Sequence, residues 1–555
     1  MSESSESPEI SRRRLPQSMS VKSTSPGDNL DEDDGAISLS EAQMKVMHLI
    51  MSRKNCFFTG AAGTGKSYCV SVLQDVLAAL GKTDVIALTA PTGVAACNIK
   101  GMTIHSWSGC GLGTDPIDKI VSKLEGFSKR AGGNDTPKER WRKSEILVID
   151  EISMLSANLF NKIDEIGRRM REVDNKPFGG IQVILCGDFF QLPPVGAGAE
   201  SKFCFESPVW DELLGGKDGM IVLDKVFRQK DGPFVRILND MRRGIVGAEA
   251  RQILTEKVRL TEKAKQQERA QEAFALQHGR QHSSTPVQAS IKATILFSRN
   301  NDCDRYNQTE LEKLPKINVN ESGQIMKSED GEEYIYDAVE QGDEHQLKGF
   351  KVPKKLELRV GSQVMLLKNL EVTAGLVNGT RGVIKRFVDP CENAGVVDEG
   401  TRAGLYFAGK PLPEVEFHVM LGSEKSTVRR TLKNEIWEVM SGEKVVASRS
   451  QIPLMLAWAI SVHKSQGMTI PYLEMGFEGI FEYGQAYVAI SRATNLPGLS
   501  LRSFTPNAVK VHPRVVEFYT GMGCNLDETE QISENNVTTT IKELCSKFKV
   551  SWFDL

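Results

Sequence analysis

A glycine-rich segment near the start of the chain has the spacing of a phosphate-binding loop. Residues 60–67 read Gly-Ala-Ala-Gly-Thr-Gly-Lys-Ser, a complete match to G-x-x-x-x-G-K-[ST]. Glycines permit a tight loop whose N–H groups surround phosphates, and the N-terminus of a following helix adds partial positive charge. In such a loop Lys66 reaches the β- and γ-phosphates, and the Ser67 hydroxyl ligates Mg²⁺. The predicted ATP-binding residues are Gly60, Ala61, Ala62, Gly63, Thr64, Gly65, Lys66 and Ser67.

Two carboxylates, Asp150 and Glu151, stand at the end of an apolar run at 146–150. A buried strand would carry Asp150 to the phosphate site, where it can hold Mg²⁺ through water, and Glu151 would orient and deprotonate the attacking water. Gln191 follows the next apolar run and is suited to touch a γ-phosphate and detect its loss. Taken alone, Asp150 and Glu151 also fit a solvated strand end, and Gln191 also fits a proline-bounded turn. Downstream of a phosphate loop they predict nucleotide hydrolysis.

The second half of the chain carries cations and hydroxyls that suit a nucleotide and a phosphodiester backbone. A single arginine is most often a surface residue. Arg228 and Arg492, however, both lie in the unit across from the phosphate loop, which suggests fingers that close on ATP between two domains. The segment 459–467 follows an apolar run. It is either a simple loop or a segment that binds a nucleic-acid backbone. The candidates for that binding are Ser461, His463 and Lys464.

Short apolar runs alternate with helical spacing from residue 39 to residue 223. This alternation is typical of a parallel sheet with helices on both faces. The run 56–59 precedes the phosphate loop and a helical stretch at 67–80 follows it, which is the context that the motif requires. The segment 101–142 breaks the alternation and is predicted to be an insertion. The other expected strands are 85–89, 146–150 and 183–187.

A second α/β unit begins near residue 224, with core strands expected at 293–297 and 454–461. Between them, short alternating strands with turns such as Asn-Gly-Thr-Arg-Gly predict an inserted antiparallel β module. A Gln-, Lys- and Glu-rich stretch at 255–285 is expected to form an exposed helix or a flexible insert. The predicted organisation is a disordered Ser-, Pro- and acid-rich tail at 1–36, a first domain at 37–223, a second at 224–520 with its β module at 355–450, and an extension at 521–555.

Composition indicates a soluble protein with several folded units. Of the 555 residues, 40% are hydrophobic and 25% charged, and the longest mostly apolar stretch, near 452–462, is far below the roughly 18 residues of a membrane span. The ten cysteines form no C-x-x-C pair, which argues against a zinc site or a disulfide framework. Residues 1–36 contribute −4 to the net charge of −3, so the rest of the chain carries +1. This net charge neither supports nor excludes binding to nucleic acid. No secretory signal is expected, and the arginines at 12–14 fit a solvated cluster better than a targeting signal.

Taken in order, these motifs resemble those of superfamily 1 helicases and, more closely, the PIF family of 5′-to-3′ DNA helicases, which are relatives of the bacterial RecD proteins. The segment 39–43 resembles the family's adenine-reading Q motif, with Gln43 as the reader. The segment 151–171 is similar to a signature of the family, and 361–383 resembles its inserted barrel of the SH3 type. The segments that resemble its nucleic-acid-contacting and final motifs are 90–96, 103–107, 457–469 and 487–493.

The resemblance implies an α/β fold of two RecA-like P-loop NTPase domains with an inserted SH3-like β-barrel. It implies ATP hydrolysis with Mg²⁺, 5′-to-3′ translocation on single-stranded DNA, and unwinding of forked DNA in replication, repair, recombination, telomere or mitochondrial genome upkeep. The implied catalytic residues are Lys66, Glu151, Gln191, Arg228 and Arg492. The implied DNA contacts are Pro91, Thr92, Gly93, His105, Ser461, His463, Lys464 and the helix at 487–493 (Tyr487 and Ala493 at its ends).

Several properties stay open at this point. An RNA or RNA–DNA hybrid helicase is the first alternative, since a sequence does not reveal a preference for the 2′-hydroxyl. A non-enzymatic scaffold switched by nucleotide is the second, and the intact Glu151 argues against it. We expect a monomer in solution that can form a dimer on DNA, no membrane partner, and a location in the nucleus or the mitochondrion, with the nucleus slightly favoured.

Overall fold

The computed structural model of the chain describes residues 36–552 with internal gaps. Nearly all of the predicted tail at 1–36 therefore lies outside the described residues. Among the residues that are described, no helix is both long enough and apolar enough to cross a membrane. The gaps are at 112, 132–135, 197–201, 230, 278–290, 320–324, 327–333, 343–346, 348–351, 372–373, 389–409, 422–423, 442–443 and 524–535.

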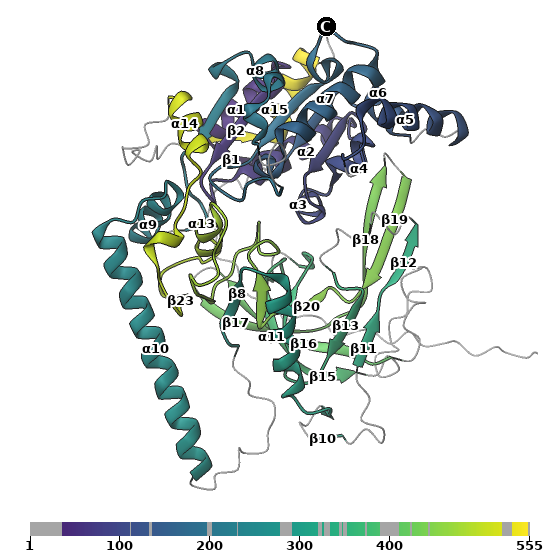
Figure 1. The fold of residues 1–555 in the computed structure, drawn as a ribbon. Helices are drawn as coiled ribbons and strands as arrows, with labels where there is room; N and C mark the ends of the chain where they lie inside the picture. The colour runs from purple at the N-terminus through teal and green to yellow at the C-terminus, as the bar shows by residue number, and fades with distance from the viewer. Residues whose placement is uncertain are drawn as a thin grey trace, which may run out of the picture.

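Six parallel strands form the sheet of the first domain in the order β4-β3-β5-β6-β2-β7. Successive side chains of β5 enter opposite cores: Leu147 packs in one with Phe160, and Val148 in the other with Val70. Because helices cover both faces (Figure 1), each strand reads as a continuous apolar run, and the predicted α/β fold is confirmed. The strands are β2 (Cys56–Gly60), β3 (Ile86–Ala90), β4 (Met102–Thr103), β5 (Ile146–Ile149), β6 (Gln182–Cys186) and β7 (Met220–Leu223).

The first helix begins where the sequence supplies a capping pair. α1 (Glu41–Met51) follows Ser40, whose hydroxyl accepts from the Gln43 N–H while Gln43 Oε1 accepts from the Ser40 N–H. The predicted insertion at 101–142 is not wholly outside the sheet, because it begins with β4, a strand too short to leave a pattern. The other helices here are α2 (Lys66–Ala79), α3 (Gly93–Asn98), α4 (Ile104–Ser108), α5 (Ile117–Ala131), α6 (Pro137–Lys143), α7 (Ala157–Arg171) and α8 (Pro208–Leu214).

A second parallel sheet, in the order β21-β8-β22-β23, forms the core of the second domain. The expectation of one strand over 454–461 is wrong: β20 (Leu454–Leu456) pairs with β14 (Gln363–Leu366) of the β module, whereas β21 (Ala459–Ser461) pairs with β8. An apolar run indicates burial but not the sheet in which each part is buried. The other elements are β8 (Thr294–Phe297), β22 (Leu473–Met475), β23 (Leu499–Leu501), α9 (Gly232–Arg242), α11 (Asn300–Glu312) and α13 (Gln485–Ile490).

Antiparallel strands make up the β module. Five form a sheet in the order β17-β16-β15-β14-β20, and β12, β19 and β18 form another that rises toward the first domain (Figure 1). The module thus extends on both sides of the predicted 355–450, and a closed SH3-like barrel stays a prediction. Its remaining strands are β9 (Asn318–Val319), β10 (Ile325–Met326), β11 (Tyr334–Asp337), β12 (Val339–Gly342), β13 (Lys355–Leu358), β15 (Arg381–Val388), β16 (Leu412–Leu421), β17 (Glu424–Thr431), β18 (Glu435–Ser441) and β19 (Lys444–Gln451).

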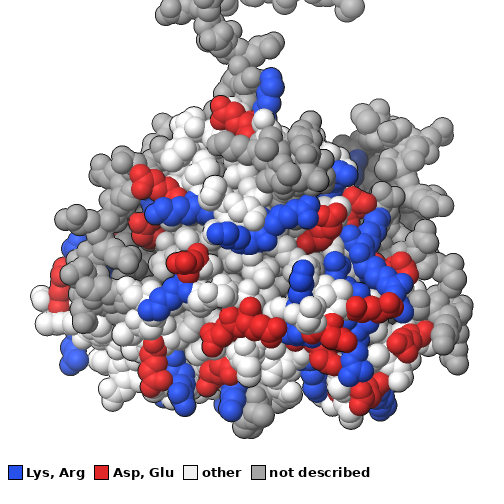
Figure 2. All heavy atoms as spheres, turned by 90° about the horizontal axis from the view of Figure 1, so that it is seen from above, with Lys and Arg blue, Asp and Glu red and all other residues white. Residues whose placement is uncertain are grey.

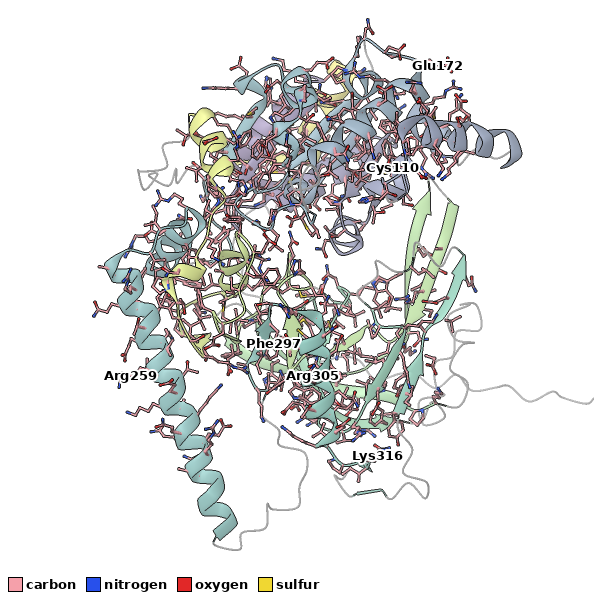
Figure 3. The ribbon with its side chains drawn as sticks, viewed as in Figure 1. Cys110, Glu172, Arg259, Phe297, Arg305 and Lys316 are labelled. Carbon is pink, nitrogen blue, oxygen red and sulfur yellow. The ribbon has the colours of Figure 1, made fainter. Side chains whose placement is uncertain are left out.

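A 30-residue helix, α10 (Ala248–Gln277), occupies most of the Gln-, Lys- and Glu-rich stretch predicted at 255–285. Near its start Leu254 is buried in the second-domain core. Figure 3 places Arg259 on this helix, where it pairs with Glu256 of the same helix at 2.7 Å. The helix still lies against the second domain here, because Thr261 Oγ1 accepts from the Leu501 N–H at 3.1 Å. The described part of the stretch is therefore an exposed helix.

The C-terminal extension returns to the first domain. Here β24 (Asn536–Thr540) pairs antiparallel with β1 (Ala36–Ser40), the strand that leads into α1. α15 (Ile541–Trp552) lies against α2, and its Leu544 is fully buried in the core on that face of the sheet. The preceding helix, α14 (Pro513–Gly521), packs on the opposite core of the same domain. The extension, for which no motif was found, is thus a structural part of the first domain.

Leu544→Ala should lower the free energy of unfolding by about 2 to 5 kcal/mol, because it leaves a cavity where a fully buried leucine stood. Thermal and denaturant unfolding measure the effect, and Lys542→Ala, at an exposed position of the same helix, is the control. Unfolding curves of the two variants that coincide with the parent curve would show that α15 contributes nothing to this core.

Candidate nucleotide site and strand path

The phosphate loop joins the buried strand β2 to helix α2, as its sequence predicts. Gly63 and Gly65 have φ values of +87° and +81°, in the left-handed region that favours glycine. The Lys66 ammonium donates to the carbonyl oxygens of Gly60 at 2.7 Å and Ala61 at 3.0 Å. Its positive charge therefore lies within the loop, close to the N–H groups at the start of α2 that suit a phosphate.

The second domain docks directly on this loop. The Tyr487 hydroxyl of α13 accepts from the Ala62 N–H at 2.7 Å, and the Phe227 N–H donates to the Gly63 carbonyl at 2.8 Å. A Cβ on Gly63 would lie 2.6 Å from the Arg228 Cβ, so this close approach requires glycine. The phosphate loop is thus part of a surface between two domains.

Asp150 and Glu151 follow β5 at the same edge of the sheet. Glu151 has a φ of +51°, which is uncommon outside glycine, and its N–H donates to Asp150 Oδ1 at 2.9 Å. Burial, and then the charge of Asp150, raise the pKa of the Glu151 carboxyl from 4.5 to about 7, while the charges of Lys66 and Arg492 oppose the shift. Burial raises the pKa of Asp150 as well. A buried carboxyl that titrates near neutrality is suited to accept a proton from water.

Arg228 and Arg492 approach this carboxylate from the second domain. Arg492 is 2% exposed, its Nε donates to the Val488 carbonyl at 2.9 Å, and its Nη2 donates to the Ser491 hydroxyl at 3.1 Å. Burial, and then the positive charge of Arg228, lower the pKa of Arg492 to about 9, while Glu151 opposes the shift. Arg492 and the Nη1 atom of Arg228 are buried. The two guanidinium groups repel each other and would gain from an anion bound beside them.

Within the described part of the chain, several buried polar atoms around the phosphate loop have no hydrogen-bond partner. They are Glu151 Oε2, Arg228 Nη1, Gln229 Oε1 and Gln466 Nε2. Unpaired buried polar atoms are costly, and native proteins keep few of them outside sites that a ligand or water completes. These atoms supply donors for phosphate oxygens and an acceptor for a water proton. The residues present therefore fit a nucleoside triphosphate and its attacking water.

The remaining predicted nucleotide residues lie at the margins of the site. Gln43 Nε2 donates to the Thr64 carbonyl at 3.3 Å, which ties the expected adenine reader to the loop. Gln191 lies in a buried turn after β6, where its N–H donates to the Asp188 carbonyl at 2.9 Å. Ser67 lies in the first turn of α2. The structure thus gathers these residues at one boundary between the domains.

Segments predicted to contact DNA face each other across the two domains. In the first domain, Thr92 Oγ1 accepts from the Ala95 N–H at 3.2 Å at the start of α3. Asn98, at the end of that helix, meets the second domain at Gly467, where a Cβ would lie 2.7 Å from Asn98 Nδ2. Because the segments belong to different domains, a change in domain angle changes their separation. The partly exposed candidates are Pro91, Thr92, Gly93, His105, His463 and Lys464.

Two of the expected DNA contacts are buried in this structure and stay predictions. Ser461 is 1% exposed, and its hydroxyl donates to Asn300 Oδ1 at 2.5 Å, so it holds the loop in place. The helix at 487–493 is buried as well, since Tyr487 is 2% exposed and Ala493 is fully buried. A sequence motif indicates a shared site but does not separate the residues that touch a ligand from those that support them.

Comparisons with known proteins agree with this geometry. A family model described as PIF1-like helicase matches residues 38–251, and one described as DNA helicase Pif1, 2B domain, matches residues 347–387. The crystal structure of Pif1 helicase from Candida albicans is 34% identical with a TM-score of 0.62, and the match covers 88% of this chain and 100% of that one. The chain belongs to the PIF1-like helicase family.

Other PIF1-like proteins extend the likeness. The ATP-dependent DNA helicase PIF1 of Homo sapiens is 37% identical over 483 residues, which cover 87% of this chain and 63% of the relative. The crystal structure of Bacteroides sp Pif1 in complex with ADP-AlF4 is 25% identical with a TM-score of 0.61, covering 87% of this chain and 97% of that one. The chain spans less than two thirds of the length of the first curated relatives that it matches. The predicted pair of RecA-like domains and the predicted family are confirmed.

The PIF1-like site includes residues that the sequence analysis missed. Gln229, next to the first expected finger, donates from Nε2 to the carbonyls of Ser491 and Ala493 at 3.1 Å each. The Gln466 amide lies near enough to the Glu151 carboxyl to lower its pKa, although Gln466 Nε2 makes no hydrogen bond, and burial has the larger, opposite effect. Each of these amides lies within a few positions of a predicted residue. Their position as polar residues inside a motif could therefore have identified them from the sequence.

The face of the first domain that points away from the second carries charges of both signs. Figure 2 shows Lys and Arg side chains interspersed with Asp and Glu over this face. On α7, Arg168 pairs with Glu212 at 2.9 Å and Arg169 with Glu165 at 2.8 Å. Nucleic-acid footprints are basic patches, whereas the described side chains on this face alternate in sign.

Proposed function

We propose that this chain is an ATP-dependent DNA helicase that translocates 5′ to 3′ on single-stranded DNA and unwinds forked duplexes in genome maintenance. The observation that carries the proposal is the buried site between two domains, where the base Glu151 and the guanidinium groups of Arg228 and Arg492 surround one phosphate loop. The name of the human relative and the ADP-AlF4 complex of the Bacteroides Pif1 support the same activity.

Mg²⁺ is the metal that fits the oxygen donors at this site. Ser67 would hold it directly and Asp150 through water. Among the residues that are described, no group of three or more His, Cys, Asp or Glu side chains forms a separate metal site. Mg²⁺ retains several waters and takes phosphate oxygens as ligands, so few protein oxygens are needed. When bound, it neutralises charge on the phosphates.

The protein groups then have separate tasks in hydrolysis. Lys66 binds the β- and γ-phosphates, and Glu151 orients the attacking water and accepts its proton. Arg228 and Arg492 stabilise the charge that spreads over the transferred phosphoryl oxygens. Gln191 responds to loss of the γ-phosphate. Because the phosphate loop and the arginines belong to different domains, closure of the domains completes the site and opening releases the products.

Domain closure also changes the strand path. The end of α3 and the loop at 461–467 meet across the domains, so a nucleotide that closes the gap alters how both grip a strand. Contacts with the sugar–phosphate backbone and with base faces carry little sequence information, which suits a motor that must pass any sequence.

The protein should unwind a duplex with a 5′ single-stranded tail and leave a 3′-tailed duplex intact, because a 5′-to-3′ motor loads on the strand that it follows. Strand displacement with ATP and Mg²⁺ measures this, and Lys66→Ala, which removes the cation of the phosphate loop, is the inactive control. Unwinding of only the 3′-tailed duplex would contradict the direction. ATPase stimulation by RNA but not DNA would favour an RNA helicase, and no ATPase with DNA would favour a scaffold.

A further inference from the structure

A buried ion pair joins the two domains beside the nucleotide site. Arg242, at the end of α9, donates from Nε and Nη2 to the two carboxylate oxygens of Asp188 at 3.0 and 2.9 Å. The Asp188 side chain is fully buried and that of Arg242 is 13% exposed. Burial lowers the pKa of Arg242, but the charge of Asp188 outweighs it and the net shift is upward. The mechanism described above uses neither residue.

Aromatic rings and hydroxyl groups surround this pair. The Arg242 guanidinium lies 4.5 Å from the ring centroid of Phe190 and 5.4 Å from that of Tyr519, and the two rings stack at 4.6 Å. The Tyr519 hydroxyl and Thr59 Oγ1 share a hydrogen bond of 2.6 Å, and the Phe189 N–H donates to the same hydroxyl at 3.2 Å. Thr59 directly precedes the phosphate loop. The cluster therefore reaches from the strand that carries the loop to α9 of the second domain.

The pair also lies at the turn that holds the predicted γ-phosphate sensor. The Asp188 carbonyl accepts from the Gln191 N–H at 2.9 Å. The same turn meets the start of α13, since a Cβ on Gly484 would lie 2.4 Å from the Gln191 oxygen and 2.5 Å from the Phe190 oxygen. α9 and α13 pack together in the second-domain core. The second domain thus contacts the turn through two helices, one of which carries Tyr487.

Stability alone does not account for a pair of this kind. Removing two charges from water offsets much of their mutual attraction, and apolar side chains of similar size often hold an interface equally well. A guanidinium that donates to both oxygens of one carboxylate fixes a single geometry, because both hydrogen bonds have defined directions. Such a contact suits a joint that has to return to the same arrangement in every cycle.

We propose that Asp188 and Arg242 are positioning residues that couple the nucleotide site to the strand path by fixing the sensor turn to α9 and, through α9, to α13. The proposal rests on the proposed helicase function. A nucleotide that displaces the Gln191 turn then carries α13 with Tyr487, and with them the loop at 461–467, because Val462 of this loop lies in the same core as α9 and α13. Without the pair, each site keeps its own residues, but the affinity of one site depends less on occupancy of the other.

Arg242→Met tests this, since it keeps most of the apolar stem and removes the fork. The ratio of Kd values for a single-stranded oligonucleotide, measured with and without a non-hydrolysable ATP analogue, reports the coupling. Such couplings are typically about 5- to 150-fold, and the variant should bring the ratio toward 1. The Kd for the analogue in the absence of DNA should stay close to that of the parent. The number of base pairs unwound per ATP hydrolysed should fall.

Arg168→Met is the matched control, because Arg168 donates to Asp164 at 2.9 Å in a comparably buried pair within the first domain. Asp188→Asn removes the partner charge with little change of shape, and Arg242→Lys should restore the ratio only in part. Kd ratios like that of the parent in both Arg242→Met and Asp188→Asn would overturn the proposal. An equal loss of coupling in Arg168→Met would also overturn it, as would a Kd ratio of 1 in an active parent. A parent without DNA-stimulated ATPase would overturn the proposed function instead.

Discussion

Arg492→Ala should lower kcat for ATP hydrolysis by about 10³- to 10⁵-fold, or roughly 4 to 7 kcal/mol, with little change in nucleotide affinity. The arginine is buried beside Glu151, and hydrogen bonds to Val488 and Ser491 hold its guanidinium in place. A finger stabilises charge that spreads over the γ-phosphoryl oxygens mainly in the transition state, and its loss therefore affects turnover more than binding. Arg228→Ala should show the same pattern, because its Nη1 is buried without a partner at the same site.

The measurements are kcat with saturating single-stranded DNA and the Kd of a non-hydrolysable analogue. Arg514→Ala is the control, because that side chain lies in the same half of the chain and is 62% exposed. DNA binding without nucleotide should be nearly unchanged in all three variants. A kcat close to that of the parent in both finger variants would show that closure of the second domain on the nucleotide is not part of catalysis.

Lysine should not replace Arg492. An ammonium group does not donate to two oxygens in a fixed plane. The site adds a second reason, because burial and the charge of Arg228 lower the pKa of Arg492 to about 9. A lysine starts from a pKa of about 10.4, so the same environment would deprotonate much of it near neutral pH. Arg492→Lys should therefore remain strongly impaired and recover less activity as the pH rises.

Consecutive residues carry the part of the site that was predictable from the sequence. The phosphate loop needs a strand before it and a helix after it, and all three lie within 56–80. Asp150 and Glu151 likewise stand at the end of a strand whose four residues are all buried. A parallel sheet brings the carboxyl ends of its strands to one edge, so these local patterns were enough to place the residues together.

The rest of the site depends on contacts between distant residues. Tyr487 meets Ala62 across 425 positions, and the sequence offered no reason to pair them. Arg242 and Asp188 lie 54 positions apart, on a helix and a turn that are each unremarkable in isolation. The C-terminal strand β24 becomes informative only when it pairs with β1. Packing across a domain boundary is not periodic in the sequence, and therefore no pattern of spacing predicts it.

Glu151→Gln should lower kcat by about 10²- to 10⁴-fold while nucleotide binding persists, because the amide keeps the shape of the side chain and loses the proton acceptor. The pH dependence is equally specific. The carboxyl accepts a proton only when it is ionised, and burial together with Asp150 raises its pKa to about 7 in the free protein. The parent kcat/KM should therefore rise as the pH increases through about 7 and fall below it, and Glu151→Gln should lose this dependence.

The predictions for Arg492→Ala and Glu151→Gln are linked through the pKa of Glu151. The assignment of Glu151 as the base can therefore be tested in two independent ways. The charge of Arg492 lowers the pKa of Glu151, so its removal should move the residual pH profile of Arg492→Ala toward higher pH. Glu145→Gln, at the exposed opposite end of β5, should leave both rate and profile unchanged. The profiles are those of kcat/KM for ATP from pH 5.5 to about 9, since kcat/KM reports the pKa of groups in the free enzyme. If Glu151→Gln hydrolyses ATP at the parent rate, or if Arg492→Ala shifts the profile downward, another group accepts the proton.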